Sequence, residues 1–133
     1  MMSKVSYLGD LRTEAIHMQS GDTIITDAPV DNEGKGEAFS PTDLVATSLA
    51  SCILTIMGIV AKRDDISLKG TNAEVEKSMS TNPRRINEIK IKIFFNKTFK
   101  KNIQKKLEKA ALSCPVSGSL NKDLNESIEF IYP

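Results

Sequence analysis

The fold is decided by residues 40–63, which read SPTDLVATSLASCILTIMGIVAKR. Ser40 suits the N-cap of a helix, Pro41 suits the first helical position, and Asp43 can complete a capping box with Ser40. The two positive charges that close the segment suit the last turn of a helix. The sequence therefore predicts one long helix that begins after Ser40 and ends at the closing Lys-Arg pair.

The middle of this helix, residues 44–61, runs for 18 residues without a charge. That length is at about the lower limit for a membrane-spanning helix. However, hydroxyl residues and Gly58 interrupt it, and the rest of the chain is typical of a soluble domain, so we expect no membrane span. A helix that is apolar nearly all round is more simply the buried axis of a soluble fold. One chain is too small to cover it, and we expect a homodimer with a large interface, more than ~2,000 Å².

The composition indicates a single soluble domain over residues 1–133. Apolar residues make up 40% and charged residues 26% of the chain, which is ordinary for a globular protein. The formal net charge is +1 and aromatic residues make up only 5%, so nucleic-acid binding is not expected. The N-terminal residues lack the apolar stretch of a secretory signal, which favours a cytoplasmic protein.

Further strands and one further helix are predicted on either side of the long helix. They are strands at 5–7, 12–19 and 23–27, strands on either side of an 80–84 turn, a helix at 99–111 and a strand at 127–132. The clearest strand is the one in which Ile89, Ile91 and Ile93 alternate with charged residues, a period of two. The order βββ–α–ββ–α–β is that of an α+β fold.

Two cysteines are the candidates for chemistry. Cys52 lies inside the uncharged helix, and Cys114 lies where an apolar helical stripe meets Pro115. A helical turn that begins at Pro115 would direct backbone N–H groups at Cys114 and lower its pKa. Because 62 residues separate the two cysteines, spacing alone leaves two readings open. They are either a working thiol pair or two small buried apolar residues.

Two motifs resemble those of the OsmC/Ohr family. Residues 40–46, followed by Ala50-Ser51-Cys52, resemble the family's Ser-Pro-x-(Glu/Asp)-Leu…Cys helix, and residues 113–117 resemble its second motif, Cys-Pro followed by a small residue. The resemblance covers essentially the whole chain. It implies an intertwined homodimer, in which each sheet wraps the long central helices and paired active sites lie at the dimer interface.

The same resemblance implies thiol-dependent reduction of organic hydroperoxides. Cys52 would attack the O–O bond and become a sulfenic acid, and Cys114 would condense with it to a disulfide. A dithiol reductant would then restore both thiols. The implied partners are thus a second copy of the chain, a small peroxide and a dithiol, and no metal or other cofactor is expected.

The sequence differs from the family motif at the position that would help to activate Cys52. The peroxidase branch of the family places a Glu after the helix-starting proline to orient an Arg, and Thr42 stands there in this chain. Asp43 therefore has two interpretations, a helix cap or the partner of a catalytic Arg. We expect Arg12 or His17 to lie close to Cys52, although a lone histidine is more often structural. Arg12 is favoured because it keeps its charge at all relevant pH values.

Two other functions stay open at this point. The Thr42 departure favours a non-catalytic or regulatory dimer that binds a small apolar molecule between its subunits. Metal binding by the two cysteines is disfavoured, because only His17 could add a further strong soft ligand.

Overall fold

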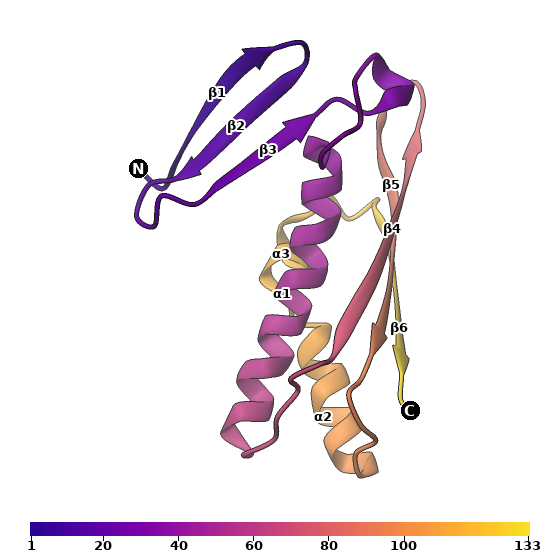
Figure 1. Cartoon of the computed structure of the whole chain (residues 1–133). Coiled ribbons are helices and arrows are strands. Elements are labelled where there is room, and N and C mark those ends of the chain that lie inside the picture. The colour runs from indigo at the N-terminus through magenta and orange to yellow at the C-terminus, as the bar shows by residue number, and fades with distance from the viewer. The chain divides into compact units, whose positions relative to one another are not determined.

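A computed structural model describes residues 1–133. In chain order the elements are β1 (Ser3–Gly9), β2 (Arg12–His17), β3 (Thr23–Asp27), the 3₁₀ turn η1 (Val30–Asn32), α1 (Pro41–Arg63), β4 (Asn72–Ser80), β5 (Arg85–Phe94), α2 (Lys101–Ala111), α3 (Pro115–Ser119) and β6 (Asn125–Ile131) (Figure 1). The predicted α+β class is confirmed, with the short helix α3 added to the predicted order. Predicted and observed bounds differ by two residues at most.

The chain divides into two compact units, Met1–Val45 and Ala46–Pro133. Helix α1 begins in the first unit and continues through the second. The expectation of one domain over the whole chain stays a prediction, and so does the intertwined dimer. The units are described separately below.

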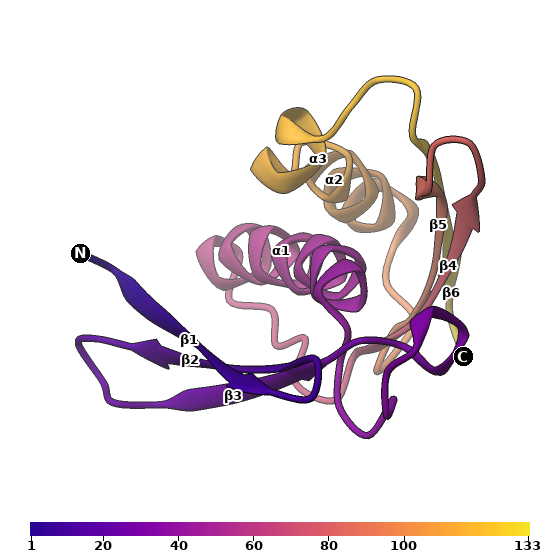
Figure 2. The same ribbon diagram turned by 90° about the horizontal axis from the view of Figure 1, so that it is seen from above.

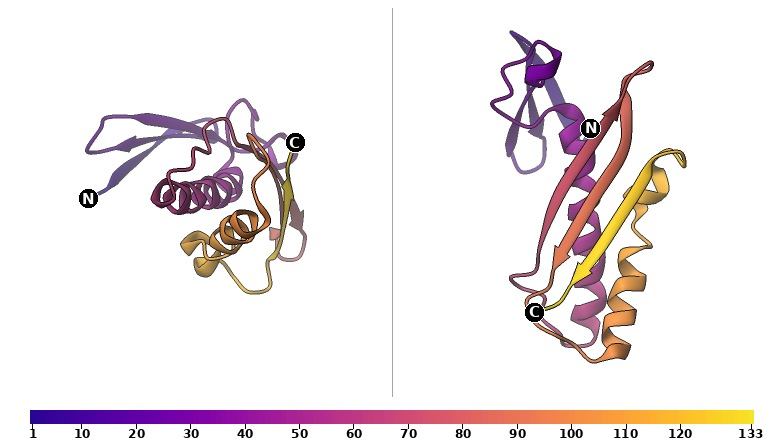
Figure 3. Two further views of the ribbon diagram at one scale, coloured as in Figure 1. Left: turned by 90° about the horizontal axis from the view of Figure 1, so that it is seen from below. Right: turned by 90° about the vertical axis from the view of Figure 1, so that its right-hand side faces the viewer.

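The second unit is a three-stranded sheet covered by helices on one face. Strand β5 is central, antiparallel to β4 and parallel to β6. Ile89, Ile91 and Ile93 point from β5 to the same face and are at most 1% exposed. Helices α1 and α2 lie together on that face of the sheet (Figure 2), and Figure 3 shows the three strands in front of them. The alternation read from the sequence therefore describes a sheet with one buried face.

Helix α1 is the core helix of the second unit. Its buried residues are Ala46, Leu49, Ala50, Ile53, Met57 and Ala61, and they form one apolar cluster with residues of β5 and α2. By length and composition alone α1 could cross a membrane, but core helices of soluble proteins meet the same criterion. Only 33% of its most apolar stretch is buried within the chain. One side of α1, along Ser48, Ser51, Thr55 and Ile59, is thus left exposed.

The first unit is a three-stranded antiparallel sheet in the order β1-β2-β3. None of its apolar side chains is buried, and its buried residues are the polar Thr26, Asp27 and Ser40. Its large exposed apolar side chains are Met1, Met2, Val5, Tyr7, Leu8, Leu11, Met18, Ile24, Val30 and Phe39. This unit is therefore held together by hydrogen bonds and not by an apolar core of its own.

The loop after β3 folds back on itself, and a glycine makes this possible. The Gly34 amide donates to the Pro29 carbonyl at 2.9 Å and the Gly36 amide to the Ala28 carbonyl at 3.2 Å. A Cβ on Gly34 would lie 1.7 Å from the Ala28 carbonyl oxygen, so no other residue fits there. The fold-back sets the position of Glu37, which follows directly.

Candidate active site

The two cysteine thiols lie next to each other in the second unit. Cys52 is half-buried in α1, and Cys114, which is 3% exposed, immediately precedes α3. Both are free thiols, and they are close enough to hydrogen-bond to each other. Folding thus brings together two sulfurs that are 62 residues apart in sequence.

The chain break at Pro115 explains the position of Cys114. Helix α2 ends at Ala111, and Pro115 is the first residue of α3. A residue before proline avoids the helical conformation, and Cys114 accordingly adopts φ −62° and ψ 125°. The turn between the two helices therefore carries the Cys114 thiol into the apolar cluster, where it packs with α1 residues.

The pKa of Cys114 is raised above its ordinary value of 9.0. Burial of the thiol is the largest cause, and its hydrogen bond with Cys52 is the second. The backbone N–H groups of Ser117 and Val116, at the start of α3, act in the opposite direction. The predicted lowering of the pKa by these amides is present, but burial of the thiol outweighs it and the net shift is upward. Cys114 is consequently a neutral thiol at pH 7.

Arg12 and Asp27 form the strongest polar pair of the first unit. They stand opposite each other on β2 and β3. Arg12 donates from Nε to Asp27 Oδ1 at 2.7 Å and from Nη2 to Asp27 Oδ2 at 2.8 Å, and the Glu37 amide donates to Oδ2 at 3.1 Å. Arg12 Nη2 also lies 3.2 Å from Glu37 Oε2. Its Nη1 atom donates to no protein group, and 30% of the side chain is exposed.

This pairing changes the proton affinities of both groups. The hydrogen bonds from Arg12 hold the pKa of the Asp27 carboxyl below its ordinary value of 3.8, against the opposing effect of burial. The hydrogen bond with Asp27 likewise raises the pKa of Arg12. Asp27 is 1% exposed and was not singled out from the sequence. The hairpin register that sets it opposite Arg12 is the signal that could have identified it.

Asp43 caps helix α1. The Asp43 amide donates to Ser40 Oγ at 3.0 Å, and the Ser40 amide donates to Asp43 Oδ2 at 2.9 Å. This is the predicted capping box. Arg12 is oriented by Asp27 and Glu37 instead, so the alternative interpretation of Asp43 as its partner gains no support.

His17 takes part in the turn between β2 and β3. Its Nδ1 atom lies 2.6 Å from Ser20 Oγ and accepts from the Ser20 amide at 3.3 Å. The side chain is exposed at the end of β2. These contacts give His17 a structural role in the hairpin.

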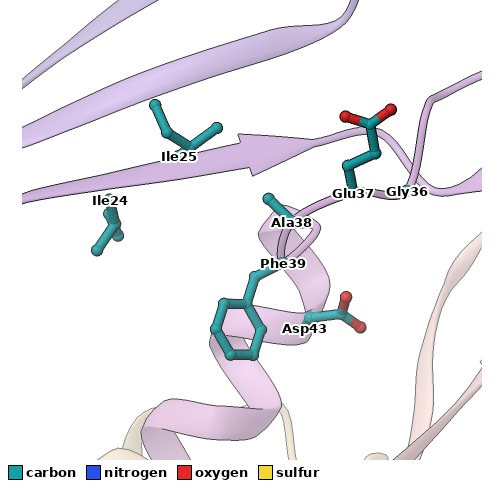
Figure 4. Close-up of a pocket in the computed structure, with 7 residues that line it drawn as sticks. All are labelled: Ile24, Ile25, Gly36, Glu37, Ala38, Phe39 and Asp43. Atoms are coloured by element: carbon teal, nitrogen blue, oxygen red, sulfur yellow. The ribbon is translucent and has the colours of Figure 1, made fainter.

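A shallow groove of about 560 Å³ lies in the first unit beside the Arg12–Asp27 pair. It is lined by Ile24, Ile25, Gly36, Glu37, Ala38, Phe39 and Asp43 (Figure 4). Apolar side chains make up most of its wall, and its two charged residues, Glu37 and Asp43, are both acidic. We call it the acidic groove. No three side chains among His, Cys, Asp and Glu are placed to hold a metal ion.

The sequence profile of the OsmC-like protein family matches residues 34–129. The chain belongs to the OsmC-like family. The match includes the α1 cysteine and the Cys114-Pro115 motif, and Arg12 and Asp27 precede it. No protein with a curated description matches the sequence.

Solved structures of similar proteins support the OsmC-like assignment. A protein of Psychrobacter arcticus 273-4, provisionally described as an osmotic stress induced and detoxification response protein, is 55% identical. Its alignment covers 98% of this chain and 95% of that chain, with a TM-score of 0.95.

Two more distant structures share the OsmC-like fold. The organic hydroperoxide resistance protein OsmC of Legionella pneumophila is 18% identical, covering 97% of this chain and 94% of that chain with a TM-score of 0.76. The organic hydroperoxide resistance protein of Elizabethkingia anophelis is 15% identical, covering 100% and 97% with a TM-score of 0.73. At these identities the likeness concerns the fold alone.

Proposed function

We propose that this protein is a thiol-dependent peroxide reductase that acts on organic hydroperoxides. The observation that carries the proposal is the adjacency of a half-buried thiol, Cys52, and a buried neutral thiol, Cys114. The thiol that attacks must be accessible to the peroxide, whereas the resolving thiol needs only to contact the attacking cysteine. The family assignment and the names of the two distant structures support the same substrate class.

The reaction balances with these two thiols and one external reductant. The Cys52 thiolate attacks the terminal oxygen of the hydroperoxide, the O–O bond breaks, and the alcohol leaves after taking up a proton. Cys114 then attacks the sulfenic acid of Cys52, releasing water and forming the disulfide. A dithiol reduces the disulfide by exchange and is itself oxidised to a disulfide. We expect this cycle to operate in the cytoplasm, where such reductants keep thiols reduced.

Arg12 is proposed to stabilise the attacking thiolate. Attack requires a thiolate rather than a thiol, so a cation or donor must approach Cys52. Asp27 and Glu37 hold one edge of the Arg12 guanidinium and leave Nη1 free to donate. Asp27 thereby takes the orienting role that the family's Glu plays at the position of Thr42. We expect Arg12 to reach the Cys52 of a second copy of the chain.

The homodimer is part of this proposal. The first unit exposes many apolar side chains and buries none, and one side of α1 is uncovered. A contiguous set of exposed apolar groups marks an interaction surface. A second copy would bury both surfaces. We expect light scattering to give twice the 14.6 kDa of one chain, and a stable monomer at micromolar concentration would contradict the arrangement.

The test is a single-turnover reaction with cumene hydroperoxide, followed by counting of the remaining thiols. Without reductant, the wild-type protein should consume one peroxide per chain and lose both thiols. The Cys114→Ser variant should consume one peroxide and yield a sulfenic acid that dimedone traps. The Cys52→Ser variant should consume none. Peroxide consumption by Cys52→Ser at the wild-type rate would overturn the proposal.

A second measurement tests Arg12. Arg12→Gln should slow peroxide reduction by about 10²-fold, the size of effect seen when one transition-state donor is removed. It should also raise the pH at which iodoacetamide alkylates Cys52. Lys4→Gln, which removes an exposed positive charge from β1 of the same unit, is the control and should change neither.

Two observations favour a second candidate function. Arg12 is already held by two carboxylates, and Thr42 replaces the family's Glu. Both features suit a non-catalytic dimer that binds a small apolar molecule. If neither Arg12→Gln nor His17→Ala alters the alkylation profile of Cys52, the binding function replaces the peroxidase.

A further inference from the structure

A cavity of about 400 Å³ lies between the end of α2, helix α3 and strand β6 in the second unit. It is lined by Ala111, Leu112, Ser117, Glu126 and Ile128. None of these residues belongs to α1 or to the first unit, the two surfaces that a second copy of the chain would cover. In Figure 3, β6 lies on the α2 side of the sheet. We call this cavity the edge pocket.

Glu126 is a carboxylate on the side of β6 that faces the helices. In the parallel register of the sheet, Glu126 stands next to Ile89 and Ile128 stands next to Ile91. Both neighbours on β5 are at most 1% exposed and point into the core. Glu126 is accordingly half-buried, whereas Glu129 on the other face of the strand is exposed. A sheet with one buried face calls for an apolar residue at position 126, so the carboxylate there needs a separate reason.

The carboxylate of Glu126 has no protein partner. It forms no ion pair and accepts no hydrogen bond, and the Ser117 hydroxyl in the same lining likewise forms no hydrogen bond with a protein group. Partial burial of a charged group without a partner costs free energy. A ligand that brings a positive charge would offset this cost, so the edge pocket favours a cation.

The acidic groove of the first unit lacks this feature. Both of its carboxylates already have partners, because Glu37 pairs with Arg12 and Asp43 accepts from the Ser40 amide. A cationic ligand would have to compete with Arg12 there, whereas in the edge pocket it would meet an unpaired carboxylate. The acidic groove is therefore an internal comparison for the edge pocket.

We propose that the edge pocket binds a primary alkylammonium ion, which is an apolar chain that ends in a charged amine. The ammonium would pair with Glu126 and donate to the Ser117 hydroxyl. The chain would cover Ile128 and Leu112, which is 66% exposed, and would gain the free energy of apolar burial. The volume lies within the ~300–1,000 Å³ of small-molecule sites. This inference does not depend on the peroxidase proposal.

A second role for Glu126 makes a different prediction. Strand β6 is an edge strand, and inward-pointing charged residues on such strands hinder pairing with another chain. Protection of the edge needs the charge and no ligand. A protein in which Glu126 served only the edge would therefore bind charged and uncharged alkyl chains alike.

The first experiment is an NMR titration of the full-length protein at pH 7 with n-hexylamine and with 1-hexanol, its uncharged analogue. We expect n-hexylamine to bind about fivefold more tightly, the gain that a partly exposed ion pair supplies, and this preference should shrink as salt is raised. Nα-acetyl-lysine methylamide is titrated in parallel. Tighter binding of this compound than of n-hexylamine would indicate the lysine side chain of a protein, and weaker binding would indicate a free amine. Equal affinity for n-hexylamine and 1-hexanol would overturn the proposal.

Two variants of the same strand locate the ammonium. Glu126→Gln should abolish the fivefold preference for n-hexylamine and leave the affinity for 1-hexanol unchanged. Glu129→Gln removes the same charge from the solvent-facing side of β6 and should keep the preference. Equal loss in both variants would mean non-specific attraction and would overturn the site, as would an unchanged preference in Glu126→Gln. Circular dichroism checks that both variants fold.

Methyl NMR signals locate the alkyl chain in the wild-type protein, where no variant has to fold. Titration with n-hexylamine should shift the methyl signals of Leu112 and Ile128, which line the edge pocket. The signals of Ile24 in the acidic groove and of Ile59 on the exposed side of α1 should stay in place. Shifts of Ile24 or Ile59 without shifts of Leu112 and Ile128 would overturn the assignment.

Discussion

The two units of this protein are held together by different forces. Every buried apolar side chain lies in the second unit, between Ala46 and Cys114. The first unit buries only polar residues, among them Asp27, which forms an ion pair with Arg12. Apolar packing therefore fixes the cysteine pair within one chain. The arginine proposed to serve it stands instead on a sheet whose apolar residues are uncovered.

The largest effect on the free energy of unfolding is expected when one isoleucine in each unit is replaced by alanine. Ile91 is 1% exposed and Ile24 is 49% exposed. Ile91→Ala should lower the free energy of unfolding by about 2–5 kcal/mol, through lost burial and a residual cavity. Ile24→Ala should cost less than about 1 kcal/mol, because this side chain lies outside the buried core of the chain. Chemical denaturation measures both. An equal cost would mean that another chain supplies the missing core of the first unit.

A smaller, local effect is expected from acid. Because the folded-state pKa of Asp27 lies below its ordinary value of 3.8, its ion pair stabilises the first unit above about pH 4. That contribution is lost as the pH falls through the lowered pKa. Hydrogen exchange of the Glu37 amide, which donates to Asp27, should lose protection as the pH is lowered below about 4, whereas the Ile91 amide should keep it.

Asp27→Asn provides the matched control for this acid effect. It keeps the size of the side chain and removes the charge, so the Glu37 amide should already be less protected at pH 7. Unchanged protection in the variant and in acid would show that the first unit does not depend on the Arg12–Asp27 pair.

A selective difference in reactivity is expected at the cysteines. Cys114 is buried and its pKa is raised, so it should stay protonated until the pH exceeds 9. Iodoacetamide at pH 8 should therefore label Cys52 first, as read by mass spectrometry of the two peptides. Cys52→Ala should remove only part of the upward shift of the Cys114 pKa, because burial of the thiol is the larger cause of that shift. Faster labelling of Cys114 would contradict this order.

The smallest effect is expected at Tyr132. Its ring stacks on Phe95 with centroids 4.4 Å apart, and its buried hydroxyl has no hydrogen-bond partner. Burial and the nearby negative charge of Glu108 raise the pKa of Tyr132 to about 12. Tyr132→Phe should change the free energy of unfolding by less than about 1 kcal/mol, because no hydrogen bond is lost. A loss above about 2 kcal/mol would show that the second unit also relies on a polar contact.

The sequence by itself determined the features that depend on neighbouring residues. The capping box fixed the start of α1, the alternation of Ile89, Ile91 and Ile93 fixed the buried face of β5, and Pro115 fixed the break after α2. Each signal lies within a few residues of the structure it predicts, because helix caps, strand pleats and proline sterics act locally.

Only the tertiary structure decided how distant residues meet. It placed the two thiols together, which their spacing left open and the family resemblance only implied. It gave Arg12 the partners Asp27 and Glu37 where Asp43 had been considered, and it raised the pKa of Cys114 where a helix start predicted a lower value. These outcomes depend on burial and on opposing contributions from separate segments, and no local pattern in the sequence encodes their balance.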